Sequence, residues 1–427
     1  MKKILFLSIN YPPMLTAGSS RAARFVARLP ELGWVPLVVA PADIAWDEDG
    51  KNRALAESAE FTGIYRTGEL VDAAAFGPGR AEQLVQGMSA AAPTGSPLRM
   101  ISGMLSGVNL VSGWEKQAAS IAEAVLSRHD PVDAIYSQGP PAAPLALALE
   151  LSKKHGLPVL FDLVAPLDAP SASGSRQSDA AQIEERVVTS GHAVITPTRA
   201  LKEYFLKKYF GKATHDDISI IPDFCTDSFV PSGAGRQVSA GAPMVTVLME
   251  QASAKELKMF FSALGRYMKH AGSFSLLPSF QVIGGDEKEI MKYSRKHVPD
   301  VSVSVLRRLS GHDELESIRK CDLFGVVAGR EGLSPLTVPE RSVDALCMGK
   351  PLFFVGPDGP AARLAVDAGG FWAPLESAEG VVQLFGSALE SIRNSPERHP
   401  GGGMPEKLSA SQVLTDLSKT LAYLLPV

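Results

Sequence analysis

The amino-acid sequence predicts an α/β protein with two doubly wound, Rossmann-like parallel-sheet domains that face each other across a cleft. Apolar β-rich runs alternate with helix-period segments along most of the chain, and a proline- and glycine-rich break divides the series in two. The apolar runs are near-continuous, which is typical of parallel strands covered by helices on both faces. A length of 427 residues fits roughly two or three domains.

The first series of elements occupies residues 1–222, the predicted N-terminal domain. We expect its strands at Lys3–Ile9, Val35–Ala40, Val132–Ser137, Pro158–Val164, Ala193–Thr196 and Ile218–Ile221. We expect its helices at Ser20–Leu32, Ala142–His155, Gln177–Thr189 and Arg199–Tyr209. The segment Asp43–Ser112 is less regular, and no motif is assigned to it.

Residues 223–243 are predicted to be an interdomain linker, because proline, glycine and small polar residues interrupt the alternation there. The second series, residues 244–404, forms the predicted C-terminal domain. Its strands are expected at Met244–Met249, Phe280–Ile283, Val301–Leu306, Leu323–Ala328 and Pro351–Val355. Its helices are expected at Lys255–His270, Glu287–His297, Asp313–Cys321, Glu340–Met348 and Pro360–Ala368. A last helix, within residues 405–427, can pack back on the N-terminal domain.

Composition excludes several function classes. Lys plus Arg number 42 and Asp plus Glu number 46, so the net charge of −4 gives no general signal for nucleic acid. Three cysteines cannot form a disulfide framework, and none has the spacing of a metal pair. We therefore predict no metal site and a reducing compartment. Neither a secretory signal nor a run of ~20 apolar residues is visible, which favours a soluble, cytoplasmic protein.

One segment leaves membrane contact open. Leu98–Val111 carries apolar residues at helical spacing, a pattern of helices that dock at a bilayer surface and also of buried helices. Only Arg99 supplies positive charge there, which favours a buried helix in the N-terminal domain. Peripheral contact with the inner face of a membrane is the alternative.

Ligands of such sheets bind beyond the carboxyl ends of the strands, so the loops after strands hold the candidate residues. The first of these loops ends in Gly18, Ser19, Ser20 and Arg21. Gly18 allows close approach of the backbone, and Ser19 or Ser20 can cap the next helix. Free N–H groups beside Arg21 suit an anion. The loop is longer than a simple connection needs, which favours a ligand role over an ordinary cap.

Asp162 stands at the end of another predicted strand of this domain. A carboxylate in that place can act as a general base or can orient a reacting group. A helix cap or a salt bridge within the loop explains the residue equally well.

The strongest candidate in the second domain is the loop and helix after Leu323–Ala328. Thr337 is expected to cap this helix, and Arg341 and Asp344 share one of its faces. A first-turn arginine beside free N–H groups suits a diphosphate, and a carboxylate one turn later suits ribose hydroxyls. The alternative is a surface ion pair. Gly284-Gly285 forms a compact turn after another strand of the same domain.

These residues resemble a known family, the family-4-type retaining glycosyltransferases of GT-B architecture, in their bacterial polysaccharide-biosynthesis branch. The similar segments are Tyr11–Pro13, Ala17–Arg21, Leu29–Pro36, Gly139–Asp162, Ile220–Pro231 and Thr337–Pro351. The resemblance implies a donor site for a nucleotide sugar, a UDP- or GDP-sugar, in the C-terminal domain. It implies a glycan or lipid-linked acceptor bound by the N-terminal domain, and no bound metal or other cofactor.

The resemblance also assigns roles to single residues. Asp344 would hold the ribose, and Arg341 with Lys255 would hold the diphosphate. The remaining donor-site candidates are Gly284, Gly285, Ser334 and Thr337. The candidate catalytic carboxylates are Asp162 and Glu331, and the acceptor-side loop comprises Gly18, Ser19 and Arg21.

Three departures from the family pattern keep other functions open. The paired glutamates of the family are eight positions apart, but Leu336 stands eight before Asp344, so Glu331 would need a rearranged loop. Lys255 is the one counterpart of an Arg/Lys pair, and the run that begins at Asp162 lacks the family's Arg, second Asp and Trp. A non-catalytic nucleotide- or glycan-binding relative, acting as a partner subunit, is the main alternative. A nucleotide-sugar epimerase is a further one.

Overall fold

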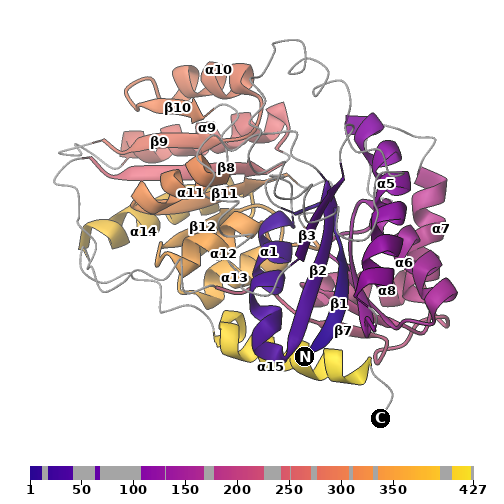
Figure 1. Cartoon of the computed structure of the whole chain (residues 1–427). Coiled ribbons are helices and arrows are strands. Elements are labelled where there is room, and N and C mark those ends of the chain that lie inside the picture. Colours follow the sequence, from indigo (N-terminus) through magenta and orange to yellow (C-terminus); the bar gives the residue numbers. More distant parts are fainter. Residues whose placement is uncertain are drawn as a thin grey trace. The chain divides into compact units, whose positions relative to one another are not determined.

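Figure 1 shows the protein as a computed structural model. The structure describes residues 1–11, 18–41, 63–67, 107–129, 131–167, 177–225, 242–250, 252–270, 277–306, 311–329, 335–394 and 406–424. The chain divides into two compact units. Unit 1 comprises Met1–Thr196, Lys202–Ile221 and Leu414–Val427, and unit 2 comprises Pro197–Leu201 and Pro222–Val413.

Unit 1 is built on a seven-stranded parallel sheet in the order β3-β2-β1-β4-β5-β6-β7. The strands are β1 (Lys2–Leu7), β2 (Trp34–Pro41), β3 (Gly63–Thr67), β4 (Ala134–Gly139), β5 (Val159–Leu163), β6 (Ala193–Thr196) and β7 (Ile218–Ile220). The helices are α1 (Ser19–Arg28), η1 (Leu29–Leu32), α5 (Gly107–Arg128), α6 (Ala142–His155), α7 (Gln177–Val188) and α8 (Arg199–Lys208). In Figure 1, α1 lies on one side of this sheet and α5 and α6 on the other. The last helix, α15 (Ala410–Tyr423), begins in unit 2 and continues in unit 1.

Unit 2 is built on a six-stranded parallel sheet in the order β10-β9-β8-β11-β12-β13. The strands are β8 (Met244–Glu250), β9 (Ser279–Ile283), β10 (Val303–Leu306), β11 (Leu323–Ala328), β12 (Leu352–Val355) and β13 (Phe371–Ala373). The helices are α9 (Ala254–His270), α10 (Glu287–His297), α11 (Gly311–Lys320), α12 (Glu340–Cys347), α13 (Pro360–Asp367), α14 (Ala378–Asn394) and the short η4 (Glu406–Leu408). One apolar core packs α9, α10 and α14 against the sheet, and another packs α11, α12 and α13. The sheet is therefore covered on both faces, which explains why its strands are apolar throughout.

In both sheets the strand order reverses beside the first strand of the unit. Strand β1 pairs with β2 and with β4, and β8 pairs with β9 and with β11. Doubly wound sheets bind ligands outside the carboxyl ends of the strands at this switch point. The loops after β1 and β4, and those after β8 and β11, are therefore the places to look for a site in each unit.

The predicted α/β class with two parallel sheets is confirmed, and most expected elements occur near their predicted bounds. Four elements were not predicted: β3, α5, β13 and α14. Two helix starts also differ from expectation. The N-cap of α1 is Gly18, not Ser19 or Ser20, and the N-cap of α12 is Pro339, not Thr337. Neither N-cap residue makes a side-chain capping hydrogen bond.

Two of the three cysteines form a disulfide, a pairing that the sequence did not lead us to expect. Cys225 and Cys347 are joined with their Cα atoms 5.4 Å apart, and both belong to unit 2. They lie in the apolar core that holds α11, α12 and α13, where Cys225 is 4% and Cys347 6% exposed. The disulfide therefore joins the start of the Pro222–Val413 segment of unit 2 to the end of α12.

Candidate functional site

A buried ion pair lies near the carboxyl edge of the unit 1 sheet. Arg21, in the first turn of α1, donates from Nε to Asp162 Oδ2 at 2.8 Å and from Nη2 to Asp162 Oδ1 at 3.0 Å. Arg21 Nη2 also donates to the carbonyl oxygen of Ile221 at 2.8 Å. Arg21 is 1% exposed and Asp162 is 0% exposed. The structure thus brings two predicted site residues together, and it pairs them with each other.

Aromatic side chains enclose this pair. The hydroxyl of Tyr136 donates to Asp162 Oδ2, and the Tyr136 ring stacks on Phe6 with 4.0 Å between centroids. The Arg21 guanidinium lies 4.5 Å from the centroid of Phe25. Both Asp162 oxygens therefore accept hydrogen bonds from the chain itself. This arrangement suits a carboxylate that orients Arg21 better than one that touches a substrate.

A polar network holds the turn that begins α1. Gly18 has a φ of 90°, in the left-handed region that favours glycine. Its carbonyl oxygen accepts from Gln138 Nε2 at 3.2 Å, and Gln138 Oε1 lies 3.0 Å from Ser8 Oγ. Asn10 Nδ2 donates to the carbonyl oxygen of Pro140 at 2.6 Å. The ends of β1 and β4 are therefore joined by buried and partly buried hydrogen bonds at the switch point, where Ser19 is 5% exposed.

In unit 2, the loop after β11 leads to a second charged cluster on α12. Arg341 donates from Nη1 to Asp344 Oδ2 at 2.8 Å, one turn further along the helix. Arg341 Nε donates to Glu314 Oε2, on α11, also at 2.8 Å. The side chain of Asp344 is 1% exposed, whereas those of Arg341 and Glu314 are 14% and 26% exposed. Glu314 was missed from the sequence, since it lies 27 residues before Arg341 and no motif links the two.

The charge around Arg341 is negative on balance. Burial alone would lower the pKa of the Arg341 guanidinium, but the negative charges of Asp344, Glu340 and Glu314 outweigh burial and raise it. One cation thus faces three carboxylates. A diphosphate at this place would meet Arg341 and the helix N–H groups, and it would also meet that negative charge.

The loops after β8 and β9 supply a different kind of site. Lys255, in the first turn of α9, is exposed, and no partner for it occurs within the described ranges. Gly284 and Gly285 both have a φ of 75°, and a Cβ atom at Gly285 would lie 3.1 Å from Met249 Cβ. Asp286 then caps α10 by accepting from the Glu289 N–H at 3.1 Å. A cationic side chain and a close-packed glycine turn therefore occupy neighbouring strand ends.

The other predicted residues fall into two groups. Glu331 and Ser334 lie outside the described residues. Thr337 lies in the described segment that leads into α12, two residues before the N-cap Pro339.

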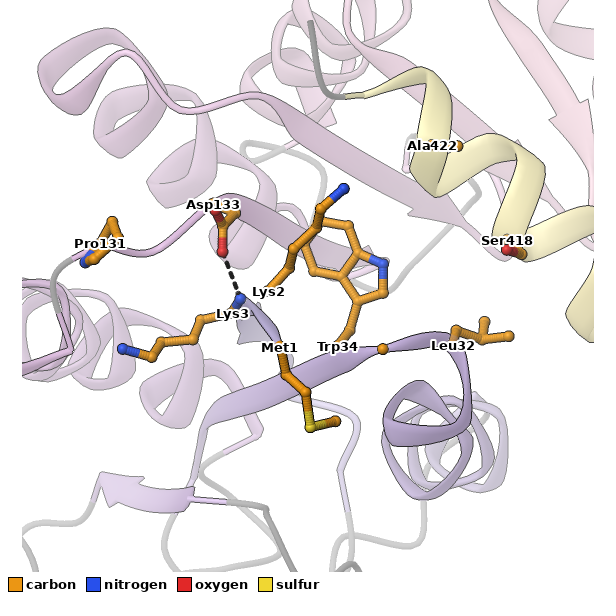
Figure 2. A pocket seen from close by; sticks show the side chains of 10 residues that line it. Met1, Lys2, Lys3, Leu32, Trp34, Pro131, Asp133, Ser418 and Ala422 are labelled. Atoms are coloured by element: carbon orange, nitrogen blue, oxygen red, sulfur yellow. Dashed lines mark hydrogen bonds between the residues drawn. The ribbon is translucent and has the colours of Figure 1, made fainter. Parts of the chain in front are cut away.

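A cavity of about 720 Å³ in unit 1 is lined by Met1–Lys3, Leu32–Trp34, Pro131, Asp133, Ser418 and Ala422. Figure 2 shows the side chains that line it. It lies at the amino ends of β1 and β2, the opposite edge of the sheet from the predicted site. Two of its polar residues, Lys3 and Asp133, form hydrogen bonds within the chain. Asp133 Oδ2 accepts from the Lys3 N–H at 2.6 Å, and Lys3 Nζ donates to the carbonyl oxygen of His129 at 3.0 Å. The carboxyl edge remains the better candidate because the switch point lies there.

The described residues contain neither a metal cluster nor a membrane-spanning helix. No cluster of three or more His, Cys, Asp or Glu side chains that could hold a metal occurs in the part of the chain that the structure describes. Among the helices within the described ranges, none is long and apolar enough to cross a bilayer. The segment Leu98–Val111, singled out above, lies largely outside the described residues.

Comparison with known proteins adds to this geometry. Residues 16–222 match a glycosyl transferase 4-like domain. The matched range contains Gly18, Ser19, Arg21 and Asp162, and therefore the whole buried pair of unit 1. No curated protein sequence matches the chain.

Solved structures share the fold over nearly the whole chain. A glycosyltransferase from Rickettsia africae has a TM-score of 0.59 at 13% identity, over 99% of this chain and 98% of that one. Sucrose-phosphate synthase from Thermosynechococcus elongatus has a TM-score of 0.62 at 12% identity, over 99% of both chains. HepE from Anabaena, in complex with UDP and glucose, has a TM-score of 0.60 at 15% identity, over 99% and 100%. At these identities the likeness establishes the fold, which is that of GT-B glycosyltransferases.

Proposed function

We propose that the protein is a retaining glycosyltransferase that moves a sugar from a nucleoside-diphosphate sugar to a glycan or lipid-linked acceptor in surface polysaccharide biosynthesis. Support comes from the fold, from the glycosyl transferase 4-like domain in residues 16–222, and from the UDP bound to HepE. A UDP-sugar is the favoured donor because HepE also occurs in complex with UDP-glucose. The proposal includes a cytoplasmic location, with peripheral membrane contact when the acceptor is a lipid.

The observation that carries this proposal is the set of side chains at the switch point of unit 2. Lys255 follows β8, the Gly284-Gly285 turn follows β9, and Arg341 follows β11. Strands β9, β8 and β11 are adjacent in the sheet, so these groups lie at one edge. Lys255, Arg341 and backbone N–H groups would bind the diphosphate, with Ser334 and Thr337 contributing from the loop before α12.

The proposed sugar transfer requires these residues to bind the donor and to stabilise negative charge. The bond between the anomeric carbon and the diphosphate oxygen breaks, a new bond to an acceptor oxygen forms, and the acceptor hydroxyl loses its proton. Cations and helix N–H groups stabilise the negative charge that develops on the leaving diphosphate. Glu331 is the candidate carboxylate near the reacting carbon.

In unit 1 the proposal assigns binding and positioning to different residues. The backbone of Gly18 and Ser19, at the start of α1, would face the acceptor. Arg21 and Asp162 would hold that start in place, since both are buried and paired with each other. Asp162 is then a positioning residue, which acts on the acceptor loop through Arg21.

Replacing Lys255 with glutamine should weaken binding of the donor nucleotide by about tenfold, because it removes one charge-assisted contact to the diphosphate. The measurement is isothermal titration calorimetry with UDP-, GDP-, ADP- and CMP-sugars, beginning with wild-type protein. Lys258→Gln is the matched control, since Lys258 is exposed on the same helix one turn later. Equal affinities of both variants and wild type would remove Lys255 from the site. Absence of binding by any nucleotide to the folded wild-type protein would refute the proposed function.

Replacing Glu314 with glutamine should strengthen UDP binding severalfold. Glutamine can still accept the hydrogen bond from Arg341 Nε, but it removes one of the three negative charges that compete with the diphosphate for this cation. Glu316→Gln serves as the control, because Glu316 lies on the same helix and pairs with Arg319 instead. Weaker binding by Glu314→Gln would contradict a direct role of Arg341 toward the diphosphate.

One observation favours a second candidate function, a nucleotide- or glycan-binding protein without transferase activity. Asp344 is 0% exposed and paired with Arg341, so neither side chain is free to meet a ribose or a diphosphate without rearrangement. Such a protein would bind UDP-sugar and leave it intact in the presence of glycan and lipid-linked acceptors. Release of UDP only when an acceptor is present would support the transferase, and conversion of the donor sugar without any acceptor would indicate an epimerase.

A further inference from the structure

The disulfide joins two parts of unit 2 that have different roles. Cys347 is the last residue of α12, the helix that carries Arg341 and Asp344. Cys225 lies four residues after Ile221, where the chain leaves unit 1, and 122 residues before Cys347. Their Cα separation of 5.4 Å is within the usual range for bridged cysteines. A single covalent bond thus attaches the candidate donor-site helix to the segment that enters unit 2.

Non-covalent contacts also hold Cys225 in place. The Cys225 N–H donates to the carbonyl oxygen of Leu408, in η4, at 3.3 Å. Cys225 also packs in the apolar core with Val343 and Leu346 of α12. Breaking the disulfide would therefore remove the covalent link between this segment and α12, and α12 would keep only its non-covalent contacts.

We propose that the Cys225–Cys347 disulfide is a redox-sensitive tether that fixes α12 in its nucleotide-binding arrangement, so that reduction weakens nucleotide binding. This inference rests on the proposed function for its ligand. In a reducing compartment, disulfides are usually transient or redox-sensing, which fits a tether that is made and broken. Cys347 lies one turn after Asp344 on α12. The redox state of Cys225 and Cys347 is therefore coupled to the arrangement of Arg341 on the same helix.

The exchange requires a dithiol reductant. A thiolate of the reductant attacks one sulfur of the bridge and forms a mixed disulfide, and the other protein sulfur leaves as a thiolate. The second thiol of the reductant then displaces the protein cysteine. Two electrons and two protons pass to the protein, which gains two thiols, and the reductant becomes a disulfide.

The third cysteine provides an internal control. Cys321 is free, and its Sγ donates to the carbonyl oxygen of Ile318 at 3.1 Å. Burial raises the pKa of the Cys321 thiol to about 11, so little thiolate is present near neutral pH. Cys321 should therefore neither compete for the pair nor change the redox response.

The first experiment counts thiols in the full-length chain under denaturing conditions, after diamide oxidation and after dithiothreitol treatment. We expect one reactive thiol in the oxidised protein and three in the reduced protein. Dithiothreitol should then weaken UDP binding by about fivefold or more, measured by calorimetry. It should also lower the melting temperature by roughly 5–15 °C. Cys321→Ser should retain both responses, and Cys225→Ser/Cys347→Ser should resemble the reduced form under all conditions.

Three thiols after oxidation, or equal UDP affinity with the bridge formed and broken, would overturn the proposal. If neither form binds any nucleotide, the proposed function fails, and the tether is then judged by hydrogen exchange alone. Faster exchange of the peptide over 340–347 on reduction would support a tether on α12, and unchanged exchange would overturn it.

Discussion

Replacing Asp162 with alanine should lower the free energy of unfolding of unit 1 by about 3–5 kcal/mol, because it leaves the buried guanidinium of Arg21 without its carboxylate. Breaking a buried pair from one side is costly, since the remaining charge stays in a poorly solvated place. Tyr136 would lose the acceptor of its hydroxyl in the same variant. The effect should be visible in urea unfolding, with hydrogen exchange assigning the loss to unit 1.

Two further variants with smaller expected losses of stability serve as comparisons for Asp162→Ala. Tyr136→Phe removes the hydroxyl that donates to Asp162 and keeps the ion pair, so it should cost about 1–2 kcal/mol. Asp216→Ala changes an exposed aspartate of the same unit and should alter stability by less than about 0.5 kcal/mol. An Asp162→Ala loss no larger than that of Asp216→Ala would show that the pair does not hold unit 1 together.

The fold was largely predictable because its signals are local. A near-continuous apolar run such as Leu323–Ala328 predicts a buried strand, and the structure has that strand with the same bounds. Helix α5 was missed although Trp114, Ala118, Ile121 and Val125 follow helical spacing and are buried. Its helical spacing directly follows an irregular segment rich in Ala, Gly and Ser, which obscures where the helix begins. A strand as short as β13, with three residues, offers too little pattern to predict.

The contacts of the candidate sites were less predictable because they join residues far apart in the chain. Arg21 and Asp162 were proposed separately, yet they meet across 141 residues because α1 follows β1 and Asp162 lies on β5. Glu314 carried no motif, and its contact with Arg341 depends on how α11 packs beside α12. The Arg341–Asp344 pair was predictable, since helix geometry alone brings residues three apart together.

The loops that would contact a substrate are the part of the site that sequence predicts least well. Sequence spacing placed Glu331 and Ser334 between β11 and α12, in a part of the chain outside the described residues. Their proposed roles therefore depend on the resemblance and not on geometry. By contrast, the glycine turn at Gly284-Gly285 follows from physical rules, because both residues adopt the left-handed conformation beside the end of β8.

Replacing Arg341 with methionine should destabilise unit 2 by about 3 kcal/mol and abolish nucleotide binding. The loss of stability follows from Asp344, whose side chain is 1% exposed and would lose the guanidinium that faces it. The loss of binding follows from the removal of the α12 cation while Glu314 and Glu340 remain. Chemical unfolding and calorimetry with UDP measure the two effects separately.

The double variant Arg341→Met/Asp344→Leu separates the structural role of the pair from its role toward a ligand. Exchanging a buried ion pair for apolar side chains of similar size is often neutral or stabilising, so the double variant should regain most of the lost stability. It should not regain nucleotide binding, because neither a cation nor a ribose partner is restored. If binding returned together with stability, the pair would serve only to hold α12 in place. The donor site would then have to be formed by Lys255, the Gly284-Gly285 turn and the helix N–H groups, which is the site that the Lys255→Gln titration addresses.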